Sequence, residues 1–536
     1  MIRNEKLTYF INIILIILFG FLSIYLSLFQ YIHPDDILAF DMYQKIKFNG
    51  DLDFNSYRKV YGGTYPPMSC LITWIIIKFN LIPIEYISPL NFRIQSVFYY
   101  ILYLVSVLLL LKNEKFITKF FCFILVLINF EIIVLSANGA PYLLYAIVPI
   151  LIFYLHNKIN IENYSKLKIF GLAFLLGFFS AYISYFSIFS YFALLCSKLL
   201  INNKFYNLRK IIRDLVSRDN IFLVLIIILN FITIYFHLRV NSNRSFNYNS
   251  GLNKEYIISL SRLIYDLGLI EYLINIKNSL YHVFQLSFLA NDYFKNNYFF
   301  YLIPLLLTIC GLVNLKRNIL KLFLFFHILI FLFLAIAGIM PFSPTRHFVI
   351  LVLPIVYLMT EGINLFLNNN RFLKKIAVLS LLILMIYHLS FTIKFLEDRK
   401  GKLEEYFRDI DNFKNIDFVA GVGYSKNFNI YSLRYGIPLV DFNIAYSLEY
   451  AKEFKLYPSN SIKLNLPKNG CAIFYSHWSK IDKKLLNEIF NEKNRVITKY
   501  KVVLENFNNT ESESLSYTKN GSNNAFLVNL CYEYLN

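Results

Sequence analysis

Long apolar runs separated by short charged connections fill the first three quarters of the chain. A membrane-spanning helix needs roughly 20 predominantly apolar residues, and eleven runs approach or reach that length. They are Tyr9–Tyr31, Ser96–Leu111, Phe120–Leu135, Tyr142–His156, Ile169–Phe186, Ile188–Leu200, Ile221–Phe236, Tyr298–Leu315, Leu320–Met340, Val349–Phe366 and Ile376–Phe395. The pattern predicts an α-helical polytopic membrane protein with about eleven transmembrane helices.

The pattern changes near residue 397, where the charge rises and the long apolar runs stop. Short segments rich in β-branched and aromatic residues then predict strands, and one segment predicts an amphipathic helix. The predicted strands are Phe418–Tyr424, Cys471–His477, Val496–Leu504 and Ala525–Leu530, and the helix is Ile481–Phe490. We therefore expect a transmembrane domain over residues 1–396 and a small α/β domain over residues 397–536.

Composition agrees with a membrane protein, since 57% of the residues are apolar and 16% are charged. In a soluble protein the net charge of +19 would suggest a nucleic-acid partner. In this chain the positive charge instead indicates which connections are cytoplasmic, because basic residues are more frequent in cytoplasmic connections. With a cytoplasmic N-terminus, the inside connections carry Lys112, Lys115 and Lys119; Lys158, Lys166 and Lys168; Lys198, Lys204, Arg209, Lys210, Arg213 and Arg218; Lys316, Arg317 and Lys321; and Arg371, Lys374 and Lys375.

This topology predicts a multi-pass protein of the inner or plasma membrane without a nucleic-acid partner. The first apolar run is expected to be a retained anchor, because it is long and no A-x-A site follows it. A first loop (residues 33–91), a second loop (240–297) and the α/β domain are expected outside the cytoplasm. The assignment requires Pro67–Ile82 to be a juxtamembrane or re-entrant helix; a full span there would move the next Lys-rich turns outside.

The six cysteines show no spacing that is typical of a zinc site. Cys471 and Cys531 both belong to the domain that is expected outside, where disulfides can form. The sequence leaves open whether these two are bonded.

The first loop combines acids, bases and a rigid turn. Its start, His33-Pro34-Asp35-Asp36, predicts a short helix over Pro34–Phe48 that lies along the membrane surface. Two acids in a first helical turn often only stabilise the helix N-terminus. Arg58, Lys59 and the turn Tyr65-Pro66-Pro67 follow in the same loop, however, and this combination suits chemistry on a lipid-borne phosphate.

A second outside turn, Met340 to His347, places Arg346 and His347 where the next apolar helix begins. Short outside turns disfavour arginine. One reading is an arginine that snorkels to ordinary lipid headgroups. The other is a phosphate clamp, because a guanidinium binds phosphate oxygens through a bidentate fork.

These motifs, with Gln44, Gly50-Asp51 and Tyr65-Pro66-Pro67-Met68, resemble the first outside loop of GT-C fold glycosyltransferases, which take sugar from a polyprenyl-phosphate donor. The segment from Arg346 to Pro354 is similar to their late turn ahead of a Leu-Pro helix. The resemblance implies a GT-C-like transmembrane domain with additional juxtamembrane helices. It extends over order and topology across about 390 residues of the membrane region.

The resemblance implies roles for individual residues. Asp35 matches the catalytic general base and Asp36 its neighbour, while Arg346, His347, Arg58 and Lys59 would bind the donor phosphate, and Tyr65 and Asn138 would line the substrate groove. A divalent metal, Mg or Mn, assists some members, with Asp35 as a possible ligand. The second outside connection, Ser136–Pro141, contains no acid. This departure leaves a metal requirement open and leaves the base to Asp35.

The sequence thus predicts a membrane glycosyltransferase with a polyprenyl-phosphate sugar donor, embedded in membrane lipid, and a glycan, lipid, glycolipid or protein acceptor on the extracytoplasmic face. An O-antigen or polysaccharide polymerase or ligase is the nearer alternative, with its chemistry in the second loop around Arg244, Arg262, Asp266 and Tyr281-His282. A lipid-linked-glycan flippase or transporter is the other. It would use ionisable groups within spans, and Glu131 is the main candidate.

Overall fold

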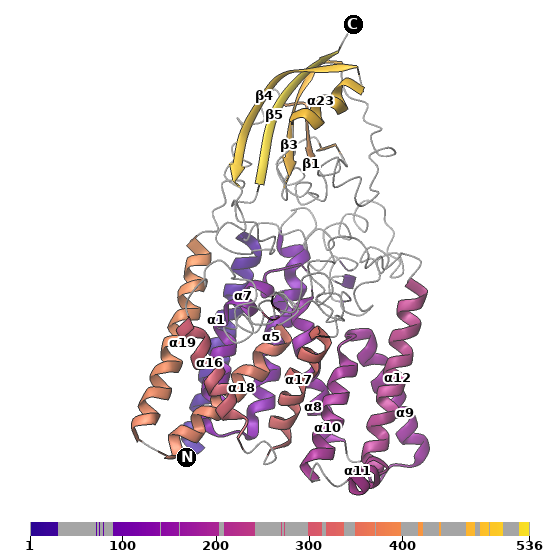
Figure 1. Cartoon of the computed structure of the whole chain (residues 1–536), viewed down its shortest axis with the longest axis vertical. Helices are drawn as coiled ribbons and strands as arrows, with labels where there is room; N and C mark the ends of the chain where they lie inside the picture. The colour runs from indigo at the N-terminus through magenta and orange to yellow at the C-terminus, as the bar shows by residue number, and fades with distance from the viewer. Residues whose placement is uncertain are drawn as a thin grey trace.

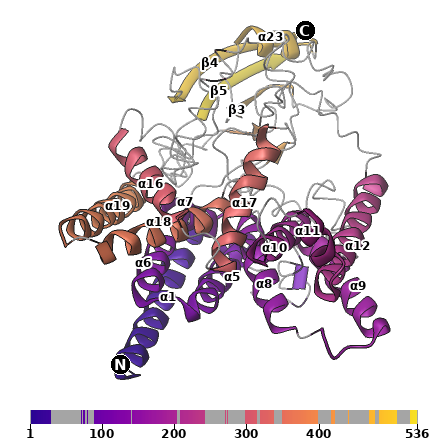
Figure 2. The ribbon, with the colours of Figure 1, turned by 60° about the horizontal axis from the view of Figure 1, so that its bottom comes forward.

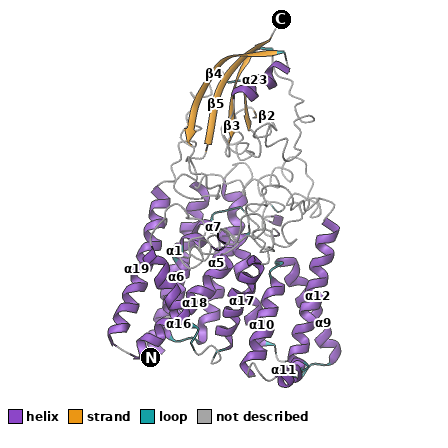
Figure 3. Cartoon of the chain, in the orientation of Figure 1, coloured by secondary structure: helices purple, strands orange, loops and turns teal. Residues whose placement is uncertain are grey.

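The computed structural model of the 536-residue chain describes most of the apolar region and part of the C-terminal domain. Described are residues 2–29, 71, 74–75, 79, 89–139, 141–159, 161–202, 208–241, 270, 273, 298–313, 318–336, 349–369, 371–397, 416–421, 439–440, 468–476, 483–492, 494–506 and 525–534. Helices form one region, and a β-sheet lies at the end of the molecule opposite the N-terminus (Figures 1 and 3).

The helical region contains long apolar helices and shorter connecting ones (Figure 1). They are α1 (Ile2–Phe29), α5 (Pro89–Leu110), the 3-10 helix η2 (Leu111–Asn113), α6 (Phe116–Leu127), α7 (Phe130–Ser136), α8 (Tyr142–Lys158), α9 (Lys166–Ile183), α10 (Ser187–Asn202), α11 (Leu208–Leu215), α12 (Arg218–Asn241), α16 (Tyr298–Gly311), α17 (Ile319–Ile336), α18 (Val349–Asn369) and α19 (Arg371–Glu397).

Each predicted apolar run coincides with a helix or with a bent helix pair. Among the described residues, α1, α5, α9 and α12 are long and apolar enough to cross a membrane, and the bent pair α6–α7 makes a fifth candidate. Shorter apolar helices occur in α8, α10, α17, α18 and α19. Several apolar candidate spans are therefore present, while the total of eleven and the orientation in the membrane stay predictions.

The run Phe120–Leu135, expected as one span, is two helices. The pair α6–α7 bends by 52° around Ile128 and Asn129. Asn129 is extended, and its side-chain oxygen accepts the N–H of Ile132 at 3.2 Å, which caps α7. At the end of α6, the hydroxyl of Tyr100 donates to the carbonyl of Leu127 at 3.2 Å. These bonds pair backbone groups that the break would otherwise leave unbonded in an apolar interior.

A polar network joins α6, α17 and α18 at the end that carries the N-terminus. The hydroxyl of Thr118 donates to Glu361 at 2.9 Å, and Asn364 donates to both. The ammonium of Lys321 lies 3.6 Å from the same carboxylate. Asn318, next to the start of α17, donates to Glu114 at 3.0 Å. Because this network fixes the start of α17 and the end of α18, the end of α17 and the start of α18 lie toward the opposite end.

Helices α16 and α18 cross without a side chain between them. A Cβ added to Gly311 would fall inside contact distance of the backbone of Leu358, and one added to Gly362 would do the same against Leu307. Small residues at helix crossings allow such close backbone approach in membrane proteins. Both helices need a glycine at the crossing, because each glycine faces the backbone of the other helix.

Gly362→Ala is therefore expected to lower the thermal stability of the purified protein, because the added methyl group forces the two backbones apart. Overpacking of this kind costs about 1–3 kcal/mol. Gly171→Ala is the matched control, since a Cβ at Gly171 meets nothing within 4 Å. Thermal unfolding in detergent, followed by the loss of monodisperse protein on size exclusion, measures both. Equal melting temperatures for the two variants would contradict the close crossing.

The C-terminal part contains a five-stranded sheet in the order β2-β1-β3-β5-β4. Its strands are β1 (Phe418–Gly421), β2 (Leu439–Val440), β3 (Gly470–Ser476), β4 (Arg495–Asn506) and β5 (Ala525–Tyr534), and helix α23 spans Lys483–Glu492. The pairs β1–β2 and β1–β3 are parallel, and β3–β5 and β4–β5 are antiparallel. The four predicted strands and the helix are confirmed, and β2 was not predicted.

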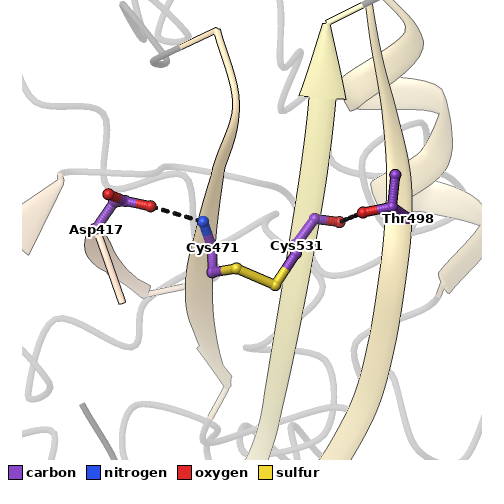
Figure 4. The surroundings of a disulfide bond; sticks show 4 residues. All are labelled: Asp417, Cys471, Thr498 and Cys531. Atoms are coloured by element: carbon purple, nitrogen blue, oxygen red, sulfur yellow. Dashed lines mark hydrogen bonds between the residues drawn. A yellow bond between two sulfur atoms is a disulfide. The ribbon is translucent and has the colours of Figure 1, made fainter. Parts of the chain in front are cut away.

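One face of this sheet packs against α23. Leu486 and Phe490 of the helix are buried, and the ring of Phe490 lies 5.0 Å from that of Tyr532 and 6.0 Å from that of Phe474. Cys471 and Cys531 face each other across β3 and β5 and form a disulfide (Figure 4). The backbone N–H of Cys471 donates to the carboxylate of Asp417 at 2.7 Å. The sequence had left this pairing open.

The disulfide predicts how many cysteine thiols react before and after reduction. Alkylation with a maleimide polymer after denaturation should modify two more cysteines in reduced than in unreduced protein. Cys531→Ser should abolish the difference, whereas Cys122→Ser, which removes a buried free thiol, should keep it. For a sequence separation of 60, the bond would stabilise this part by about 4 kcal/mol in the chain-entropy model. Six reactive thiols before reduction would show that the bond is absent.

Candidate functional site

Of the residues that the sequence assigns to the site, the structure describes Asn138. Asp35, Asp36, Arg58, Lys59, Tyr65, Arg346 and His347 lie outside the described residues. So do the predicted helix Pro34–Phe48 and most of Pro67–Ile82, within which the N–H of Phe79 donates to the carbonyl of Ile75 at 3.0 Å. The site is therefore built from the helix ends that border these segments.

Asn138 lies in the turn that follows α7. It is 1% exposed, and its N–H donates to the carbonyl of Leu135 at 3.3 Å. The turn is held by its neighbours on two helices: Ser23 of α1 donates to the carbonyl of Ser136 at 3.2 Å, and Gln95 of α5 donates to the carbonyl of Gly139 at 3.0 Å. The turn is thus bonded to both helices that flank the first loop.

Arg93 of α5 is a fully buried cation that the sequence reasoning missed. Its guanidinium donates to the carbonyl of Ser27 at 3.0 Å, two residues before α1 ends at Phe29. The last four carbonyls of a helix lack intrahelical partners, and a cation is favourable at that negative end. Arg93 therefore caps α1 from a neighbouring helix. It was missed because a single arginine at the start of an apolar run is typical of a residue that flanks a membrane-spanning helix.

Glu131 is also buried, with 1% exposure. The sequence placed it inside an uninterrupted span, but the break at Asn129 puts it in the first turn of α7. A carboxylate is favourable at a helix N-terminus, where unpaired N–H groups point outward. This environment differs from that of an acid in the middle of a continuous span.

Together these residues form what we call the loop-end cluster: Ser23, Ser27, Arg93, Gln95, Ser136, Asn138 and Gly139. It lies where α1 and α7 end and α5 begins, and it combines a buried cation with amide and hydroxyl groups. The buried carboxylate of Glu131 lies at the other end of α7. Such groups are costly inside a membrane protein unless they are paired or functional. Within the described part of the chain, no group of three or more His, Cys, Asp or Glu residues could hold a metal ion.

No protein-family model and no curated protein matches the chain. In architecture it is similar to the crystal structure of ArnT from Cupriavidus metallidurans bound to undecaprenyl phosphate. The likeness covers 96% of this chain and 97% of that one, with a TM-score of 0.48 and 11% identity.

Arg93→Met should lower the thermal stability of the purified protein, because the carbonyl of Ser27 loses its donor. A buried bond to a charged group contributes about 1.5–3 kcal/mol. Lys115→Met is the control, since Lys115 is exposed just before α6. Thermal unfolding in detergent compares them. If both variants melt with the wild type, Arg93 does not hold the end of α1.

Proposed function

We propose that the chain is a membrane glycosyltransferase that moves a sugar from a polyprenyl-phosphate donor to a glycan, lipid or protein acceptor. In this proposal, the reaction takes place on the extracytoplasmic face, with Asp35 as general base and Arg346 on the donor phosphate. The proposal joins the sequence resemblance to the arrangement of the described helix ends.

The observation that carries it is the pairing of the two ends of the first loop. The bond from Arg93 to Ser27 ties the start of α5 to the end of α1, and the bond from Gln95 to Gly139 ties α5 to the turn that holds Asn138. The chain between α1 and α5, which includes Asp35, therefore leaves and returns beside the loop-end cluster. This supports a site that the first loop and the turn after α7 build together.

The position of Arg346 has indirect support. Its turn connects the end of α17 to the start of α18, and the polar network around Glu361 holds the other ends of these helices near the start of α6. The α6–α7 pair runs from there to the turn with Asn138. The turn of Arg346 is thereby expected at the same end of the helical region as the first loop.

The proposed mechanism needs few groups. Asp35 accepts the proton of the acceptor hydroxyl as its oxygen attacks the anomeric carbon of the donor. The bond between that carbon and the phosphate oxygen breaks, and polyprenyl phosphate leaves. Arg346, with His347, Arg58 and Lys59, stabilises the negative charge on the leaving phosphate. Asp36 neighbours the base, and Tyr65 and Asn138 line the groove.

Asp35→Asn should remove the general base that accepts the proton of the acceptor hydroxyl, while the side chain keeps its shape. Loss of general-base catalysis typically costs about 10²–10⁴-fold in rate, so sugar transfer from a polyprenyl-phosphate donor should fall by at least about 100-fold. Binding of the donor should change little, because the asparagine removes no phosphate ligand. Radiolabelled sugar transfer by the purified protein measures the rate, and donor binding is measured separately.

Asp53→Asn is the matched control, because it removes an acid from the same loop outside the assigned motifs. It should keep most of the activity. Near wild-type transfer by Asp35→Asn, or an equal loss in both variants, would reject Asp35 as the base.

A second candidate function, a lipid-linked-glycan flippase, is favoured by one observation. Transporters often place an ionisable group at a broken helix inside the membrane, and Glu131 lies in the first turn of α7, the second half of the bent pair α6–α7. Translocation of a labelled polyprenyl-linked sugar across liposomes, without sugar transfer, would support this function. The polymerase or ligase alternative depends on the second loop, whose residues Arg244, Arg262, Asp266, Tyr281 and His282 lie outside the described residues.

A further inference from the structure

Two segments at the end of the helical region that carries the N-terminus expose both apolar and basic side chains. We call these two segments the basal rim and define it as residues 162–168, which lead into α9, and 212–218, which run from α11 to the start of α12 (Figures 1 and 2). Leu167 is 81% exposed, Ile212 54% and Val216 64%. The exposed basic residues are Lys166, Lys168, Arg213 and Arg218.

Hydrogen bonds hold the two segments of the basal rim in place. The guanidinium of Arg218 donates to the carbonyl of Glu162 at 2.7 Å, which joins one segment to the other. Buried Asn220 donates to the carbonyl of Asp214 at 2.8 Å, and the N–H of Ser217 donates to the same carbonyl at 2.9 Å. Ile212 and Val216 are therefore exposed on a turn whose backbone is held by hydrogen bonds.

Apolar exposure continues from the basal rim along the helices that rise from it. Phe170 and Phe174 of α9 and Ile221 and Ile228 of α12 are each between 41% and 51% exposed. On candidate membrane-spanning helices, such side chains face lipid. The apolar part of the rim is thus continuous with a lipid-facing surface and lies where that surface ends.

The charges of the basal rim indicate which class of lipid it binds. The two segments contain Lys166, Lys168, Arg213 and Arg218 against Glu162 and Asp214, four cations and two acids, for a net charge of +2. A helix with an apolar face and basic neighbours, lying along the membrane surface, matches the boundary between acyl chains and anionic headgroups. A zwitterionic headgroup would gain little from these cations.

We propose that the basal rim binds anionic phospholipid in the leaflet at this end of the protein. Ile212, Val216 and Leu167 contact the acyl chains near the headgroups, and Lys168 and Arg213 bind the anionic headgroups. This inference is independent of the proposed catalytic function. The other possible occupant, a protein that docks from the aqueous side, is an outcome of the test.

The first test compares thermal unfolding in nanodiscs of phosphatidylcholine with and without phosphatidylglycerol. Phosphatidylglycerol should raise the melting temperature of the wild type, and the double variant Lys168→Gln/Arg213→Gln should lose at least half of that rise. The control, Lys112→Gln/Lys115→Gln, removes two exposed charges from another connection that is predicted on the same side and should keep the rise. No rise in the wild type, or an equal loss in both double variants, would overturn the proposal.

The second test measures where the apolar side chain lies. A nitroxide is attached at Ile212→Cys in protein whose Cys70, Cys122, Cys196 and Cys310 are alanine, which leaves the disulfide intact. In nanodiscs the label should be accessible to oxygen and protected from a water-soluble nickel complex, whereas a label at Lys112→Cys should show the reverse. Access of the nickel complex to position 212 would exclude burial in lipid and would favour an aqueous protein partner.

Discussion

The requirement that buried backbone groups find partners governs the part of this protein where α1 and α7 end and α5 begins. An apolar surrounding offers no water, so each carbonyl freed by a helix end needs a donor from the protein. Three places create such carbonyls: the bend between α6 and α7, the end of α7 with the turn that follows it, and the end of α1. The donors come from side chains of α1 and α5, in the bonds Tyr100–Leu127, Ser23–Ser136, Gln95–Gly139 and Arg93–Ser27. One helix, α5, supplies three of these four donors.

Two kinds of side-chain hydrogen bond stabilise the helical region. Where the chain changes direction, near the ends of α1 and α7 and in the basal rim, side chains donate to backbone carbonyls. The network of Thr118, Lys321, Glu361 and Asn364 instead joins side chains of α6, α17 and α18 to one another. Bonds of the first kind shape turns, and bonds of the second kind fix the relative positions of helices. The candidate site lies among bonds of the first kind.

Sequence patterns predicted the helices and strands well, because apolar runs and alternating segments report burial directly. They did not predict the bend at Asn129, since a helix cap inside an apolar run has no effect on hydrophobic periodicity. The role of Arg93 was missed for a related reason: its partner is a backbone carbonyl 66 residues away, which leaves no mark on composition. The short strand β2 has two residues, too few for a recognisable pattern. The acids and bases of the first loop and of the turn with Arg346 remain predictions, because these residues lie outside the described part of the chain.

The reciprocal glycines of α16 and α18 have a mechanical consequence. Each backbone rests where the other lacks a side chain, so sliding one helix along the other would bring a Cβ into the crossing. The crossing therefore fixes the position of each helix along the other, and the two helices should turn or tilt together. Helix α16 follows the second loop, and α18 follows the turn of Arg346. A tilt of either helix would therefore displace the starts of both, at Tyr298 and at Val349.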